Sequence, residues 1–168
     1  TASASDKVYD GTTTAATTLT FSGLIGSETL GQTVGSTFSD KNVDTGKTVT
    51  VNSITLANGT NGGLASNYTI SSGQTTTADI TAKALTVSGI TASDKIYDGT
   101  TAATLGTGAV VYGGLVSGDT LTGTYSGVFD IDGNVGSGKT VIITSSYGGA
   151  DVNNSVSYTH LRAHETRI

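Results

Sequence analysis

The chain has 168 residues, among them 33 Thr, 24 Gly and 19 Ser, and contains no Pro, Cys, Met or Trp. Because β-branched residues favour pleated strands over helices, this composition predicts a β-rich protein with a small core. The lack of Cys excludes disulfides and thiolate nucleophiles, and the net charge of −5 disfavours nucleic acid as a ligand. No apolar run approaches the roughly 18 residues of a membrane-spanning helix.

A ten-residue segment near the start of the chain occurs twice. Residues 4–13 read Ala-Ser-Asp-Lys-Val-Tyr-Asp-Gly-Thr-Thr, and residues 92–101 differ from them only by Ile in place of Val. The similarity continues downstream, where residues 21–30 resemble residues 112–121. A period of about 90 residues is too long for a solenoid repeat and indicates tandem small domains.

Alternating hydrophobicity predicts the strands in chain order. Residues 30–38 place Leu30, Val34 and Phe38 on one face, which we expect to be buried. The next apolar run changes phase in its middle, which predicts a β-bulge near Asn52 or Ser53.

Further alternating runs at residues 78–82 and 85–87 complete a set of short strands separated by Gly-rich turns. We therefore predict an all-β protein built of tandem small antiparallel β-sandwich modules of immunoglobulin-like type, with a β-grasp-like fold as the alternative.

Comparison of the two copies defines the modules. Residues 83–90 have no counterpart before Thr1, and residues 67–80 have none after Asn154. We expect a first module at residues 1–82 that lacks its first strand, and a second at residues 83–154 that lacks its last strand. Each module then has an unpaired sheet edge. We expect the second module to be the less stable of the two.

The last residues differ in composition from the rest of the chain. Both His and both Arg fall within residues 160–167. The sequence there resembles a translated sequencing adapter, and we interpret residues 155–168 as a non-native tail.

The repeated Lys-x-Tyr-Asp-Gly-Thr-Thr segments, together with residues 40–49 and 67–70, resemble the YDG repeat of large bacterial surface adhesins, including filamentous-haemagglutinin-like exoproteins. The resemblance implies a non-catalytic spacer or stalk module of a secreted or surface-attached protein, with neighbouring repeats of the same chain as partners. The alternative is an adhesive module that binds a host or environmental glycan or protein.

The signature residues have two interpretations. In the first, Asp-Gly forms a tight turn and the preceding Tyr covers the core. In the second, the Tyr stacks on a sugar and the Asp accepts hydrogen bonds from it. We favour the first interpretation for both copies, which comprise Tyr9, Asp10, Gly11, Tyr97, Asp98 and Gly99. Clustering of Tyr112, Tyr125 and Tyr147 on an exposed face would instead favour sugar binding.

Other chemistry has little support in the sequence. Asp130, Asp132 and Asn134 place oxygen donors at alternate positions, as in part of a calcium loop, but the Gly and Glu of a complete EF-hand loop are missing. Residues 1–159 contain no His or Cys to act as a base for a Ser or Thr nucleophile. We expect no catalytic residues and no cofactor, with calcium as the one alternative.

Overall fold

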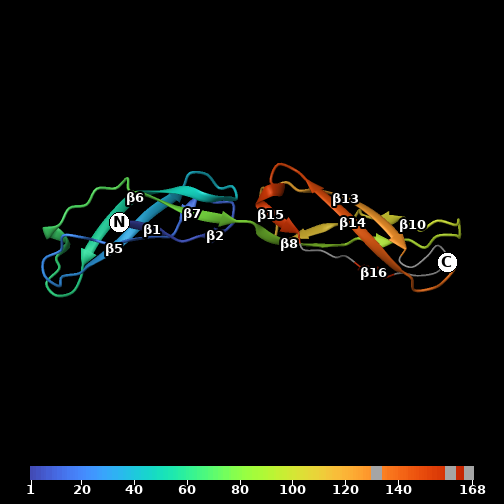
Figure 1. Ribbon diagram of the computed structural model, residues 1–168, viewed down its shortest axis with the longest axis horizontal. Coiled ribbons are helices and arrows are strands. Elements are labelled where there is room, and N and C mark those ends of the chain that lie inside the picture. Colours follow the sequence, from blue (N-terminus) through green and yellow to red (C-terminus); the bar gives the residue numbers. More distant parts are fainter. Residues whose placement is uncertain (130–133, 158–161, 165–168) are drawn as a thin grey trace. The chain divides into compact units, whose positions relative to one another are not determined.

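The computed structural model describes residues 1–129, 134–157 and 162–164. The chain divides into two compact units, unit 1 (Thr1–Ala82) and unit 2 (Lys83–Ile168) (Figure 1). Among the described residues, no helix is long and apolar enough to cross a membrane.

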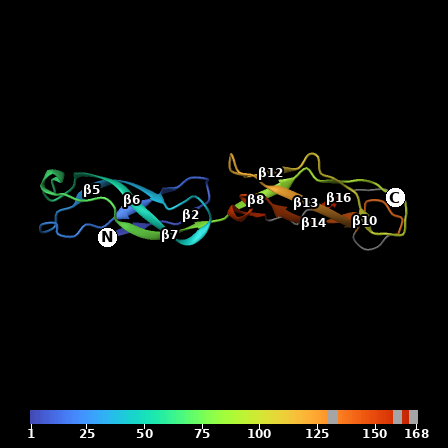
Figure 2. The same ribbon diagram turned by 90° about the horizontal axis from the view of Figure 1, so that it is seen from above.

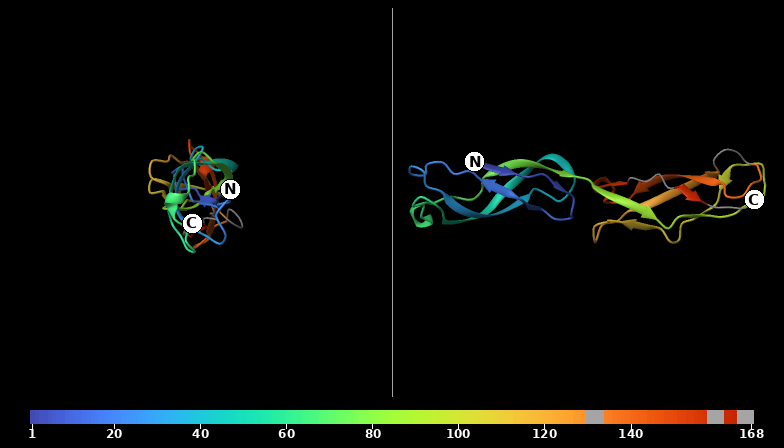
Figure 3. Two further views of the ribbon diagram at one scale, coloured as in Figure 1. Left: turned by 90° about the vertical axis from the view of Figure 1, so that its left-hand side faces the viewer. Right: turned by 90° about the horizontal axis from the view of Figure 1, so that it is seen from below.

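Unit 1 is formed by short strands around one long hairpin. Its elements are β1 (Ala2–Ala4), β2 (Lys7–Val8), β3 (Thr14–Ala15), β4 (Thr17–Leu19), β5 (Leu30–Phe38), β6 (Asp44–Asn58), the 3₁₀ turn η1 (Ala65–Asn67) and β7 (Thr75–Thr81). One sheet has the strand order β2-β7-β6-β5-β3, and β1 pairs with β4 in a second. The first residues of the chain, in blue, lie beside the green β7 (Figures 1 and 3).

The hairpin of β5 and β6 contains the expected bulge. Gly35 lies opposite Ser53 and Ser36 opposite Val51, so Asn52 is the additional residue. The Asn52 side-chain amide donates to the Thr37 hydroxyl across the strands at 3.0 Å. The prediction of a bulge near Asn52 or Ser53 is therefore confirmed.

The core of unit 1 lies between its two sheets. Tyr9, Val49, Val51 and Ile80 are at most 1% exposed. Phe38 is buried as predicted, whereas Leu30 and Val34 on the same face of β5 are only half-buried. The core therefore thins towards the Leu30 end of the hairpin.

Unit 2 repeats this pattern and adds a strand at its start. Its described elements are β8 (Lys83–Ser88), β9 (Thr91–Ala92), β10 (Ala102–Ala103), β11 (Leu105–Gly106), β12 (Val111–Gly113), β13 (Thr122–Phe129), β14 (Thr140–Gly148), the 3₁₀ turn η2 (Val152–Asn154), β15 (Ser155–Ser157) and β16 (Arg162–His164). The β13–β14 hairpin corresponds to β5–β6, and β9 pairs with β11 as β1 pairs with β4.

The additional strand β8 is central to one sheet of unit 2. This sheet has the order β12-β8-β15, and a second sheet has the order β10-β13-β14-β16 (Figures 1 and 2). The buried apolar residues of unit 2 within the described part of the chain are Leu85, Val87, Phe129 and Val141. Two of these four come from β8, so this strand supplies much of the core.

The segment that we interpret as a tail contains two short strands. Ser155–Ser157 runs parallel to β8, and Arg162–His164 pairs antiparallel with β14. Whether this segment is non-native stays a prediction.

The all-β prediction is confirmed, since the described chain consists of several small sheets and 3₁₀ turns. In the described ranges there is no α-helix to pack across a sheet, which favours the sandwich over the β-grasp-like alternative. The immunoglobulin-like type itself stays a prediction.

Candidate functional site

The first signature segment forms a loop around the ammonium group of Lys7. Lys7 Nζ lies 2.7 Å from Asp10 Oδ1 and donates to the Thr12 carbonyl at 2.9 Å, the Thr12 hydroxyl at 3.0 Å and the Thr14 carbonyl at 3.2 Å. Asp10 Oδ1 also accepts the backbone N–H and the hydroxyl of Thr12, each at 2.8 Å. The Phe38 ring centroid lies 5.8 Å from the ammonium. We call this arrangement the lysine loop.

Unit 2 contains the same lysine loop. Lys95 Nζ lies 2.7 Å from Asp98 Oδ1 and donates to the Thr100 carbonyl at 2.9 Å and the Ala102 carbonyl at 3.1 Å. The Phe129 ring replaces that of Phe38, with its centroid 5.9 Å from the ammonium. The repeated sequence therefore encodes a repeated set of internal contacts.

The loop geometry explains the types of residue in the signature. Gly11 and Gly99 have φ angles of 79° and 77°, a region that side chains other than Gly rarely adopt. The turn bends the chain back, so that the lysine reaches the carbonyls beyond it. The hydrogen bond from Lys7 is the main cause that lowers the pKa of Asp10 to about 2, and the hydrogen bond from Lys95 does the same for Asp98.

The two signature tyrosines lie in different surroundings. Tyr9 is 1% exposed, and its backbone N–H donates to the Thr81 carbonyl at 2.8 Å, so β7 covers it. Tyr97, which we expected to cover the core of its module, is 56% exposed, and that expectation is wrong. The physical reason is that, among the described residues of unit 2, no strand pairs beside Tyr97 as β7 does beside Tyr9.

The three later tyrosines come together in unit 2. The ring centroids of Tyr112 and Tyr125 lie 6.3 and 6.1 Å from that of Tyr147, both edge to face, and the Tyr112 and Tyr125 hydroxyls are 3.0 Å apart. All three are half-buried. A Cβ atom at Gly123 would lie 2.2 Å from the Tyr125 hydroxyl oxygen, so a larger residue there would require the tyrosine side chains to shift. Burial raises the pKa of Tyr125.

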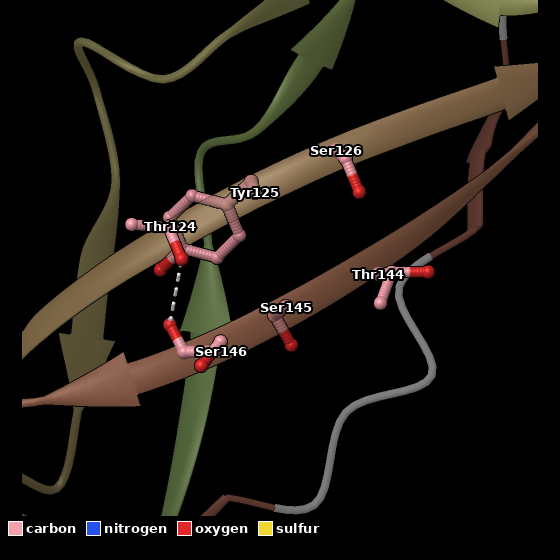
Figure 4. A pocket seen from close by; sticks show the side chains of 6 residues that line it. All are labelled: Thr124, Tyr125, Ser126, Thr144, Ser145 and Ser146. Atoms are coloured by element: carbon pink, nitrogen blue, oxygen red, sulfur yellow. Dashed lines mark hydrogen bonds between the residues drawn. The ribbon is translucent and has the colours of Figure 1, made fainter.

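A shallow pocket of about 180 Å³ lies on the β13–β14 hairpin beside this cluster (Figure 4). All six residues that line it bear a hydroxyl: Thr124, Tyr125, Ser126, Thr144, Ser145 and Ser146. The Thr124 hydroxyl donates to the Ser146 carbonyl at 3.4 Å across the strands. The pocket therefore offers hydroxyl groups and one ring, and none of its lining residues is charged.

Two of the three residues of the calcium hypothesis, Asp130 and Asp132, lie outside the described residues. Asn134 is described, and its carbonyl accepts a hydrogen bond from Lys139 Nζ at 2.8 Å. Among the residues that the structure describes, no group of three or more His, Cys, Asp or Glu is arranged to hold a metal ion. The calcium site stays a prediction.

Sequence reasoning missed the role of the two signature lysines. We singled out Tyr, Asp and Gly, whereas Lys7 and Lys95 make the contacts that join the ends of each loop. The signal was present, because both lysines recur in the two copies together with the threonine five residues later, Thr12 and Thr100, that each of them contacts.

A duplicated all-β unit with a lysine loop in each copy defines a tandem repeat protein. The family model of the YDG domain matches residues 1–78 and 81–160, and the chain therefore belongs to the YDG domain family. No curated protein and no solved structure matches the chain.

Proposed function

We propose that the chain is a non-catalytic structural spacer, part of the stalk of a large secreted or surface-attached bacterial adhesin. The observation that carries this proposal is the lysine loop. In both units the signature carboxylate is bonded to the lysine and threonine of its own loop. The signature residues therefore stabilise the loop of their own unit.

Composition and duplication support the same role. A spacer must keep its shape and avoid unspecific association, and a chain with only 12% charged residues and many threonines offers few sites for ionic attachment. The role requires no cofactor, and the partners of each repeat are its neighbours in the chain.

The second candidate is an adhesive module that binds a glycan or a protein. The observation that favours it is the meeting of Tyr112, Tyr125 and Tyr147 beside the hydroxyl-lined pocket. Against it, the rings pack edge to face on one another, so their faces are partly used inside the cluster.

Two measurements on the whole chain separate these functions. On a glycan array the spacer should give no retained binding, and in a surface display fusion it should increase the antibody accessibility of a terminal tag in proportion to the number of copies inserted. A glycan signal that is lost in Tyr147→Ala and kept in Tyr97→Ala would overturn the spacer in favour of adhesion. Tyr97 is the matched control because it is 56% exposed and lies outside the cluster.

A further inference from the structure

Unit 1 has a groove at the place where unit 2 holds one of its strands. The groove has a volume of about 200 Å³ and is lined by residues 20–22, by residues 68–70 and by the side chains of Leu24, Leu30 and Leu56, with Thr1 at its edge. We call residues 20–22 and 68–70 its walls; Leu30 and Leu56 of the β5–β6 hairpin contribute to its apolar lining.

Each wall corresponds to a strand of unit 2. Residues 20–22 align with β12, as the similarity of residues 21–30 to 112–121 shows. Residues 68–70 follow η1 as β15, the first strand of the segment that we interpret as a tail, follows η2. The two segments share this position although residues 67–80 have no counterpart after Asn154 by sequence similarity. The backbone is extended after both turns, with φ −129° and ψ 148° at Tyr68 and φ −134° and ψ 144° at Ser155.

In unit 2 the strand β8 lies between the counterparts of these walls, β12 and β15 (Figures 1 and 2). It pairs antiparallel with β12, where Val87 lies opposite Tyr112, and parallel with β15, where Lys83 lies opposite Ser155. Its Leu85 and Val87 are 1% and 4% exposed.

The residues next to Leu85 have counterparts in the groove. Leu85 lies beside Leu121 and Tyr147 around a small cavity. By the alignment and the hairpin register, these two residues correspond to Leu30 and Leu56, which line the groove in unit 1. The groove of unit 1 therefore has the place for a leucine such as Leu85.

The walls of the groove are held in position by hydrogen bonds. Tyr68 Oη donates to Glu28 Oε2 and accepts the Ile25 N–H at 3.2 Å, which fixes one wall. On the other wall the Thr1 ammonium donates to the Thr20 carbonyl at 2.7 Å and the Thr20 N–H donates to the Thr1 carbonyl at 2.8 Å, so the Thr20 backbone is already paired with Thr1. Within the described part of the chain, residues 21–22 and 68–70 belong to no strand ladder.

We propose that this groove binds an extended β-strand of the β8 type, supplied by the connecting segment of a further YDG repeat. The bound strand forms an antiparallel ladder with residues 21–22, beyond the pair of Thr20 with Thr1, and a parallel ladder with residues 68–70, and places alternate apolar residues, Leu-x-Val, into the groove. The register of unit 2 sets the lysine of such a strand opposite Tyr68, whose hydroxyl is bonded to the Glu28 carboxylate. The inference rests on the proposed function only for the source of the strand.

One difference between the units bears on selectivity. A Cβ atom at Gly113 would lie 2.4 Å from the Thr86 hydroxyl oxygen, and unit 1 has Ser22 at the corresponding position. The groove should therefore accept a small residue between Leu and Val at least as well as it accepts Thr.

The test is titration of the whole chain with a fluorescent synthetic peptide that has the sequence of residues 83–90. We expect saturable binding of this peptide. A peptide with Leu85→Asp and Val87→Asp should bind at least about tenfold more weakly, because both introduced carboxylates would lose their hydration in the groove. A peptide with Thr86→Ala should bind as tightly or more tightly. In the protein, Ile70→Asp in the groove should weaken binding about tenfold, and the control Val135→Asp, at a residue 66% exposed outside the groove, should not.

A second arm joins the same eight residues in front of Thr1. The fused strand should abolish peptide binding and raise the thermal stability of unit 1. Lack of peptide binding, or equal binding of the Asp-substituted peptide, would overturn the proposal. Concentration-dependent self-association without peptide, lost in Ile70→Asp, would assign the groove to a second copy of the chain and also overturn it. None of these outcomes depends on whether the protein is a spacer, which the array and display experiments decide.

Discussion

Replacement of Lys7 by Met tests whether the lysine loop holds unit 1 together. Met keeps a side chain of similar length and removes the ammonium, which contacts Asp10, Thr12 and Thr14. Hydrogen bonds from a charged donor are worth about 1.5–3 kcal/mol each when buried. The Asp10 side chain is 52% exposed, so screening by water limits the ion pair to about 1 kcal/mol. The carbonyl bonds, partly replaced by water, add about 1–2 kcal/mol.

The total expected loss is therefore about 2–3 kcal/mol of the free energy of unfolding of unit 1. For a domain of this size, 1 kcal/mol lowers Tm by about 4–8 °C, so Tm of unit 1 should fall by roughly 8–24 °C. Hydrogen exchange with mass spectrometry during a temperature series reports on each unit separately.

The matched control is Lys95→Met, which removes the same ammonium from unit 2 and should lower the Tm of that unit alone. A second control, Lys83→Met, should change either Tm by less than about 4 °C, since a substitution outside such a network costs about 0.5 kcal/mol. A fall of less than about 2 °C in unit 1 for Lys7→Met would refute the reasoning, because it would mean that the loop contacts contribute nothing measurable.

Four further predictions follow from the contacts. Both units should lose stability as the pH falls from about 4 to 2. The pKa values of Asp10 and Asp98 are about 2 in the folded state against an ordinary value of 3.8, and the stabilisation by a carboxylate with a lowered pKa is lost when it is protonated. Circular dichroism of the Asp10→Asn variant should show a shallower acid transition in unit 1, and an unchanged transition would contradict the assignment. Alkaline absorbance titration should show Tyr125 ionising after the exposed tyrosines, and simultaneous ionisation of all would exclude the buried cluster. Gly63→Ala should cost unit 1 about 2 kcal/mol or more, because its Cβ would lie 1.9 Å from the Thr29 carbonyl oxygen, whereas Gly108→Ala, with open space around it, should cost less than about 1 kcal/mol in urea titrations. Limited proteolysis should cut unit 2 before unit 1, since fewer of the described residues of unit 2 are buried, and the reverse order would contradict this prediction.

Local patterns allowed part of the fold to be predicted. A strand with one buried face alternates with period two, so the phase change before Ile54 was enough to predict a bulge near Asn52 or Ser53, and the register places it at Asn52. The Asp-Gly pair likewise indicated the turn at Gly11, which has a positive φ.

Non-local contacts could not be predicted in the same way. Two of the four contacts of Lys7 go to backbone carbonyls, which every residue has, so the type of the residue does not mark these two in the sequence. The exposure of Tyr97 depends on which strand lies beside it, and strand pairing over tens of residues is not encoded in alternation. The position of β8 between β12 and β15 was missed for the same reason.

The parallel pairing of β2 with β7 has a mechanical consequence. Lys7 lies opposite Ile80 and Val8 opposite Thr81, so a strand near the start of unit 1 runs beside the strand that ends it. When the chain is pulled from both sides, tension enters along residues 1–8 and leaves along β7, in opposite directions on two parallel neighbours.

Such strands are loaded in shear, and their hydrogen bonds must break together rather than one after another as in an unzipping hairpin. The force at which unit 1 yields should therefore depend on this short ladder, whose rupture sets the rate of forced unfolding. The long β5–β6 hairpin, with most of the sheet pairing, lies outside the path of the load.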